Sequence, residues 1–173
     1  MRPMPVNVTT PENRYVETWR AFIELRREGR ARSIGVSNFT RAHIQRLTDE
    51  TGVVPAVNQI ELHPCFQQKD MRDFHDHHGI VTQSWSPLGR GQLQGNETIT
   101  ELASKYGRSW AQIVIRWHLD NKLSVIPKSV TPERIRQNFD VFDFQLASED
   151  VARINKLHSD KGRIGAHPDE IRP

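Results

Sequence analysis

Basic and hydroxyl side chains gather where an apolar segment passes into a helical pattern, in the stretch IPKSVTPERIRQN. Thr131 suits the N-cap of that helix and Pro132 its first position, so the unpaired N–H groups of the first turn would face Lys128. Arg134 and Arg136 follow in the first two turns, where cations oppose the helix dipole. The stretch therefore indicates an anion-binding site, although a solvated basic helix would carry the same residues.

Polar groups also stand at the ends of the earlier apolar segments. Ser37 and Asn38 follow the first of these segments, and Gln59 lies in the second. Trp85 and Ser86 end the third. In a (β/α) barrel the carboxyl ends of the strands form the functional face, and a phosphate site often follows the last strands. We therefore expect these groups on one face.

Strand and helix patterns alternate along the chain, which predicts an α/β fold. Short apolar segments predict strands at 34–36, 55–62, 80–85 and 123–127. Amphipathic patterns predict helices at 12–29, 41–51, 67–79, 97–106, 109–120 and 148–157, besides the helix after Thr131. Such strand–helix units imply a parallel sheet with helical crossovers. An open doubly wound sheet is the alternative, but the G-x-G-x-x-G turn that it would need for a dinucleotide is absent.

The composition is that of an ordinary globular chain of 173 residues, with 36% hydrophobic and 26% charged residues. A formal charge of +3 without a basic stripe and aromatic platforms argues against a nucleic-acid partner. The single cysteine, Cys65, fits a reducing compartment and is expected to serve packing. Neither a signal peptide nor a membrane span is visible in the sequence, so we expect a cytoplasmic protein.

The run HDHH at residues 75–78 raises the alternative of a metal site. His75 and His78 are three positions apart, as two ligands on one helix face would be, but no third ligand is near in the sequence. A solvated helix end is therefore favoured, with no metal. His63 and His118 are expected to have structural roles.

Several of these segments resemble the aldo-keto reductase family. The matching motifs are RSIGVSNF, VVPAVNQIELHP, SWSPLGRG, IPKSVTPERIRQN and AHPDE, in the family's order and spacing. The resemblance extends over nearly the whole chain from about Asn13 and is closest to the bacterial group that contains 2,5-diketo-D-gluconate reductases. It implies the C-terminal half of a (β/α)8 TIM barrel, about four βα units plus extra helices. It also implies NADPH as cofactor and reduction of small-molecule aldehydes or ketones.

The resemblance also implies which residues hold the nicotinamide end of the cofactor. Ser37, Asn38 and Gln59 would hydrogen-bond the carboxamide. Trp85 would stack on the nicotinamide ring. Relatives often carry glycine at the position of Ser86, so the contact there is expected to differ.

At the other end of the cofactor, Leu88 and Gly89 would shape the loop over the pyrophosphate. The adenosine 2′-phosphate would be held by Lys128, Ser129, Val130 and Arg134. The adenine would be held by Gln137 and Asn138. The opening stretch would then be a phosphate site in which a bidentate arginine favours NADPH over NADH.

A complete barrel of this kind needs about 250 residues, so residues 1–173 are expected to form a single partial domain without the first half of the barrel. The family's catalytic tyrosine, lysine and aspartate would lie in that half. Met1 aligns with the catalytic histidine and Arg2 with the tryptophan after it. We therefore expect no catalytic residue here and no activity from the isolated chain. The alternatives to part of a reductase are a non-catalytic NADPH-binding or interaction module and a gene fragment without separate function.

A half barrel would also leave its end strands unpaired and its inner face uncovered, with Ile34, Val36, Val57, Ile60 and Val125 as candidates for that face. Exposed apolar sheet edges favour association. We therefore expect either a dimer, in which two halves make one pseudo-barrel, or a poorly soluble and partly molten chain.

Overall fold

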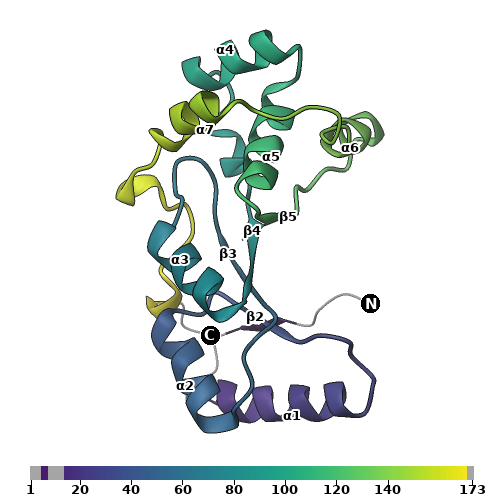
Figure 1. The fold of residues 1–173 in the computed structure, drawn as a ribbon, viewed down its shortest axis with the longest axis vertical. Helices are drawn as coiled ribbons and strands as arrows, with labels where there is room; N and C mark the ends of the chain where they lie inside the picture. Colours follow the sequence, from purple (N-terminus) through teal and green to yellow (C-terminus); the bar gives the residue numbers. More distant parts are fainter. Residues whose placement is uncertain (1–4, 8–13, 171–173) are drawn as a thin grey trace. The chain divides into compact units, whose positions relative to one another are not determined.

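The chain alternates strands and helices in the computed structural model, which describes residues 5–7 and 14–170 (Figure 1). The strands are β1 Pro5–Asn7, β2 Gly35–Ser37, β3 Val57–Glu61, β4 Val81–Trp85 and β5 Ser124–Val125. The helices are α1 Tyr15–Arg27, α2 Arg41–Thr51, α3 Lys69–His78, α4 Glu97–Tyr106, α5 Trp110–Asp120, α6 Pro132–Phe139 and α7 Ser148–Asn155. Short 3₁₀ helices lie at Gly89–Gly91, Asp160–Gly162 and Pro168–Glu170.

The strands hydrogen-bond in the order β1-β2-β3-β4-β5, which is their order along the chain. The β1–β2 and β2–β3 pairs are parallel, and Ser37 lies opposite Gln59 in the second pair. A doubly wound sheet reverses its strand order at a switch point. The sequential order therefore excludes the doubly wound alternative and is consistent with part of a (β/α)8 barrel.

Strand β1 corrects the expectation of four strands, because the structure has a fifth at Pro5–Asn7. The expected first strand, now β2, consequently has neighbours on both sides, and the ends of the strand order are β1 and β5. A strand of three residues that begins with proline is too short to show a two-residue period, so its sequence carries no strand signal.

Local capping signals define the ends of several helices. Thr40 is the N-cap of α2: its side chain accepts from the backbone N–H of His43, and the His43 ring accepts from the backbone N–H of Thr40. The helices α2, α3 and α4 end in left-handed glycines at Gly52, Gly79 and Gly107. These glycines stop the helices where the sequence predicted.

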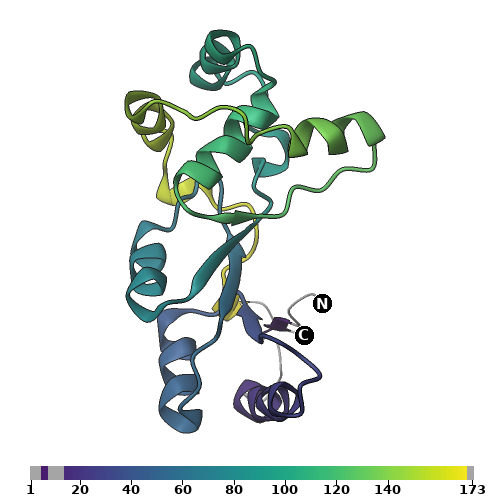
Figure 2. The same cartoon turned by 45° about the vertical axis from the view of Figure 1, so that its right-hand side comes forward.

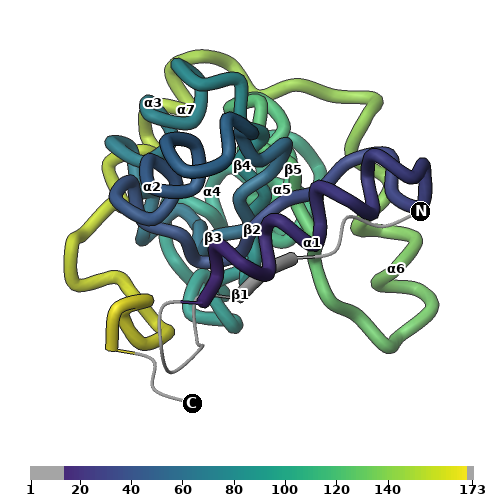
Figure 3. Tube along the Cα trace, turned by 90° about the horizontal axis from the view of Figure 1, so that it is seen from below, coloured from purple at the N-terminus to yellow at the C-terminus, as the bar shows by residue number. Residues whose placement is uncertain are grey.

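The chain divides into two compact units. The first contains the described residues up to Ile60, Gln68–Gln83 and the described residues from Gly165. Its core joins α1 and α2 to the strands, and α1 and α2 pack side by side (Figures 1 and 3). The buried side chains of this core are Tyr15, Val16, Trp19, Ile34, Val36, Phe39, Ile44, Leu47 and Ile80. The expectation of one partial domain over the whole chain stays a prediction.

The second unit contains Glu61–Gln67 and Ser84–Ile164 and is organised around α5. Helix α5 contacts α4, α6 and α7, with α6 on one side and α7 on the other (Figures 1 and 2). Trp117 of α5 is fully buried, and its indole N–H donates to Asn155 Oδ1 at 2.8 Å. Helix α6 buries none of its side chains, so its polar face is available to a ligand.

The expectation of a solvated helix end at 75–78 is wrong for His75. This ring is 0% exposed and contacts Asn58 and Thr82, whereas His77 and His78 are exposed. His63 and His118 are also buried and hydrogen-bonded to neighbouring groups, as a structural role requires. Within residues 14–170, no three potential ligands come close enough to hold a metal ion. No helix in that range has the length and apolar character of a bilayer span.

Candidate functional site

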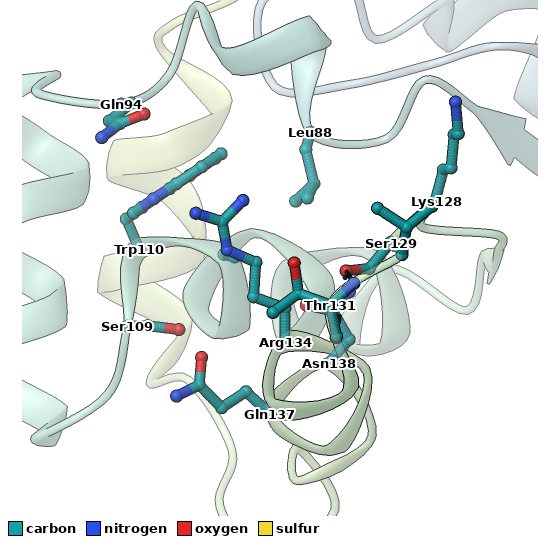
Figure 4. A pocket seen from close by; sticks show the side chains of 12 residues that line it. Leu88, Gln94, Ser109, Trp110, Lys128, Ser129, Thr131, Arg134, Gln137 and Asn138 are labelled. Carbon is teal, nitrogen blue, oxygen red and sulfur yellow. Dashed lines mark hydrogen bonds between the residues drawn. The ribbon is translucent and has the colours of Figure 1, made fainter.

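A cavity of about 360 Å³ opens in the second unit beside the start of α6 (Figure 4). Its size falls within the range of about 300–1,000 Å³ that is usual for small-molecule sites. Seven of the residues implied as cofactor ligands line it: Leu88, Lys128, Ser129, Val130, Arg134, Gln137 and Asn138. The structure thus brings together the residues implied for the 2′-phosphate and the adenine, together with one residue of the pyrophosphate loop.

The start of α6 has the geometry of an anion site. Thr131 is the N-cap and Pro132 the first helical residue, as predicted, but the Thr131 side chain makes no capping hydrogen bond. Instead the backbone N–H of Thr131 donates to Ser129 Oγ at 3.3 Å. The first-turn N–H groups are therefore left uncapped by Thr131, next to the cavity that Arg134 lines.

The two arginines of α6 differ in position. Arg134 lines the cavity and Arg136 does not. In the view of Figure 4 the guanidinium of Arg134 lies between Trp110 and Leu88, while the Lys128 side chain extends away from the other polar groups. A guanidinium offers five N–H donors in a planar fork and suits bidentate contacts with a phosphate. Arg134 is therefore the cation best placed to hold an anion here.

Sequence reasoning did not find the opposite wall of the cavity. Gln94, Ser109, Trp110 and Ala111 line it and come from the loop before α4 and from the start of α5. Ser109 caps α5: its Oγ accepts from the backbone N–H of Gln112. The sequence shows only that Trp110 directly follows the N-cap Ser109, whereas its partial exposure and its place in the wall come from the tertiary structure.

The residues implied for the carboxamide form a separate group in the first unit. Ser37 Oγ donates to the carbonyl oxygen of Gln59 at 3.1 Å, and the backbone N–H of Asn38 donates to the same oxygen at 2.9 Å. Gln59 Nε2 donates to Gln83 Oε1 at 2.6 Å. This contact orients the Gln59 amide and leaves its Oε1 as an acceptor. Gln83 was not singled out in the sequence, although it lies two positions before Trp85 on the same strand.

The end of β4 and the loop after it carry the remaining implied residues, Trp85, Ser86 and Gly89, which do not line the cavity. Trp85 is half-buried, and its carbonyl oxygen accepts from Leu62 N–H at 3.3 Å. Ser86 has φ of +49°, a left-handed conformation that favours glycine. Gly89 is buried with φ of +58°, and its N–H closes a turn onto Ser86 O at 2.8 Å.

His63 lies beneath this loop. Its Nε2 is 3.3 Å from Glu61 Oε1, and both side chains are buried. Burial lowers the pKa of His63, against the opposing influence of Glu61. Glu61 Oε1 also accepts from the backbone N–H of Ile164 at 2.6 Å, so the pair ties the end of β3 to the C-terminal segment of the same unit. A structural role for His63 stays a prediction.

The sequential strand order identifies an α/β protein consistent with part of a (β/α)8 barrel, and a cavity lined by Arg134 lies at the start of the helix after β5. Residues 6–159 match the Aldo/keto reductase family. The chain belongs to this family.

Individual relatives agree with this assignment. The methylglyoxal reductase DkgA of Escherichia coli (strain K12) is 54% identical over 159 residues, which are 91% of this chain and 58% of that protein. The structure of a Gox0644 mutant in complex with NADPH is 52% identical with a TM-score of 0.91, and covers 93% of this chain and 59% of that one. A structure assigned as a 2,5-diketo-D-gluconic acid reductase B is 29% identical with a TM-score of 0.84, over 91% of this chain and 56% of that one. This chain thus spans less than two thirds of these relatives.

Proposed function

We propose that this chain is the NADPH-binding, C-terminal half of an aldo-keto reductase that reduces small aldehydes and ketones, with methylglyoxal and diketo-gluconate-like compounds as the substrate class. The observation that carries the proposal is the cavity at the start of α6, where residues implied for the 2′-phosphate and the adenine lie together. NADPH-bound Gox0644 supports it, because that structure resembles this one over most of the chain. A cytoplasmic location belongs to the same proposal.

The residues present fit the cofactor. Arg134 and the uncapped first turn of α6 would hold the 2′-phosphate, while Gln137 and Asn138 would contact the adenine. In the first unit, Ser37, Asn38 and the oriented amide of Gln59 offer both donors and acceptors to a carboxamide. When bound, NADPH would supply the hydride. The residues of this chain would bind and orient it.

The isolated chain is proposed to lack reductase activity. Carbonyl reduction needs a general acid for the developing alkoxide. The chain contains two tyrosines, and both lie in helices. Tyr15 is packed in the core of the first unit, and Tyr106 Oη donates to Asp150 Oδ2 at 2.6 Å. The catalytic groups are proposed to belong to the first half of the barrel. The alignment of Met1 and Arg2 with the catalytic strand lies outside the described residues.

Adenosine 2′,5′-bisphosphate provides the direct test of the cavity. We expect Arg134→Gln to weaken its binding to the purified chain by about 30-fold, because a charge-assisted contact with phosphate is worth roughly 2 kcal/mol. Arg136→Gln is the matched control on the same helix and should leave the affinity unchanged. Equal effects of the two substitutions, or no binding by the unaltered chain, would contradict the proposal.

A non-catalytic NADPH-binding module is the second candidate, favoured by the placement of both tyrosines. Measurable NADPH affinity together with no oxidation of NADPH in the presence of small aldehydes and 2,5-diketo acids is expected under either candidate. Turnover comparable to that of a full-length reductase would exclude both. The coding sequence upstream separates them, since an in-frame His-Trp pair and a tyrosine-containing segment would indicate a longer reductase.

The expectation of an uncovered inner face is wrong for Ile34, Val36 and Ile60, which are buried. We propose instead that the chain self-associates through another surface, an apolar groove of about 560 Å³ beside β5. Phe139 and Phe142 line it with their side chains 75% and 66% exposed, and their rings meet edge to face with centroids 5.5 Å apart. Ile135 of α6 is exposed beside them. Exposed apolar groups of this size favour association with another surface.

A further inference from the structure

A buried chain of polar side chains runs through the first unit and involves α3, β3 and β4. His75 and Asn58 are fully buried and Thr82 is nearly so. Asn58 Nδ2 lies 3.1 Å from His75 Nε2, and His75 Nδ1 lies 2.8 Å from Thr82 Oγ1. Buried polar groups destabilise a fold unless they are paired, so three of them in contact within the core suggest a specific role.

The buried polar contacts continue from Asn58 to the backbone of Phe39. Asn58 Nδ2 donates to Phe39 O at 2.9 Å, and Asn58 Oδ1 accepts from Phe39 N–H at 3.4 Å. The Asn58 amide thus binds both the N–H and the carbonyl oxygen of Phe39, which lies in the loop between β2 and α2.

These contacts determine the positions of the hydrogens. Phe39 O can only accept, so the nitrogen of the Asn58 amide must face it, and the second Nδ2 hydrogen then points at His75. His75 Nε2 must therefore carry a lone pair, and the ring proton lies on Nδ1, where it donates to Thr82. Burial and, second, the nearby His78 lower the pKa of His75 to about 4, so the ring remains neutral near pH 7.

The residue before Phe39 is Asn38, which has φ of +58°. Its own N–H donates to Gln59 O, and the next peptide is held by Asn58. The peptide groups before and after Asn38 are therefore hydrogen-bonded to two adjacent residues of β3, Gln59 and Asn58. Asparagine tolerates the left-handed conformation better than most residues, but still at a cost that surrounding contacts must offset.

We infer that His75 and Asn58 are positioning residues for the nicotinamide end of the cofactor: His75 orients the Asn58 amide, which in turn fixes the loop that presents Asn38. Neither residue contacts the cofactor in this assignment. The inference rests on the proposed function, because that function makes Asn38 a carboxamide partner. A leucine at position 75 could fill the space but would leave the second Asn58 hydrogen without an acceptor.

Paired substitutions separate hydrogen bonding from packing. His75→Leu removes the acceptor, whereas His75→Gln can place an amide oxygen near the position of Nε2 and restore it. His78→Leu, on the exposed end of the same helix, is the control. Affinities are measured for NADPH and for adenosine 2′,5′-bisphosphate, which lacks the nicotinamide half.

We expect His75→Leu to weaken NADPH binding by about fivefold, the worth of one hydrogen bond, with no change for the bisphosphate. His75→Gln and His78→Leu should stay close to the wild-type values for both ligands. An unchanged ratio of the two affinities in His75→Leu would overturn the inference, as would equal losses in the Leu and Gln variants. If the wild-type chain did not bind the bisphosphate at all, the proposed function itself would be refuted.

Two further measurements need no ligand. Nitrogen-15 NMR of the wild-type chain should show His75 as the Nδ1–H tautomer at pH 7; the Nε2–H tautomer or a charged ring would overturn the inference even if the variants fail to fold. Hydrogen exchange of the Phe39 amide should be faster in His75→Leu than in His75→Gln. The same exchange rate in both variants would mean that the ring does not act through Asn58.

Discussion

Gly35 and Val57 approach each other so closely that a Cβ atom on Gly35 would lie 2.2 Å from Val57 Cγ1 and 2.6 Å from Val57 O. The contact joins the start of β2 to the start of β3. Two positions further along, Ser37 of β2 pairs with Gln59 of β3. The absence of a side chain at Gly35 therefore permits the strand spacing on which the proposed carboxamide site depends.

Gly35→Ala should lower the free energy of unfolding by about 3 kcal/mol, because the strands must separate to admit the methyl group. Urea denaturation measures this loss. Gly29→Ala is the control: no atom lies within 4 Å of its added Cβ, but φ is +72°, so a cost of about 1 kcal/mol is expected from the backbone alone. Equal losses in both variants would show that the contact with Val57 is easily relieved.

Ser86→Gly should raise the free energy of unfolding by about 0.5–1 kcal/mol, since glycine adopts the left-handed conformation at this position without the steric cost of a Cβ. The same measurement on Ser104→Gly, within the exposed face of α4, should show a loss of similar size, because glycine destabilises an ordinary helical position. Opposite signs for the two serine-to-glycine changes are the expected result; a loss in both would contradict the strain at Ser86.

Stability should decline as the pH falls from about 6.5 to about 4. The pKa of His75 is lowered from 6.5 to about 4 in the folded chain, so the unfolded state takes up a proton first as the pH drops. The difference between the folded and unfolded pKa values corresponds to about 3 kcal/mol of unfolding free energy. This contribution is fully present above pH 6.5 and is lost by pH 4. Burial also lowers the pKa values of His43 and His63, which adds a loss in the same direction.

His75→Gln isolates the His75 contribution to this pH dependence, because glutamine does not titrate. Between pH 7 and pH 4 the variant should lose less stability than the wild-type chain, as followed by denaturant unfolding at each pH. Parallel stability curves for the two proteins would mean that His75 titrates alike in the folded and unfolded states.

Self-association should depend on the groove beside β5. Changing Phe139 and Phe142 together to serine should weaken association at least about 100-fold, because burying each ring is worth roughly 1.5–3 kcal/mol. Light scattering at low micromolar concentration measures the effect. Val54→Ser, at another apolar side chain that is 36% exposed, is the control and should change nothing. A monodisperse wild-type monomer with a sharp thermal transition would refute association through this surface.

The sequence by itself determined most of the element order and the grouping of basic and hydroxyl side chains before α6. Helix caps such as Thr40 and stops such as Gly52 act through hydrogen bonds and backbone angles of adjacent residues, so they can be read locally. Lys128, Ser129 and Arg134 fall within a few positions of one another, and the turn into α6 is enough to bring them to one cavity.

Only the tertiary structure decided the rest, because it depended on contacts between segments far apart in the chain. Trp110 reaches the cavity through the packing of α5 against α6, which no local pattern records. His75 stands among charged residues that predict a solvated surface, yet β3 and β4 supply Asn58 and Thr82 as its buried partners. Strand β1 is defined by its pairing with β2 rather than by its own residues. A local pattern shows which groups a segment offers, whereas burial and hydrogen-bond partners are decided by whatever packs against it.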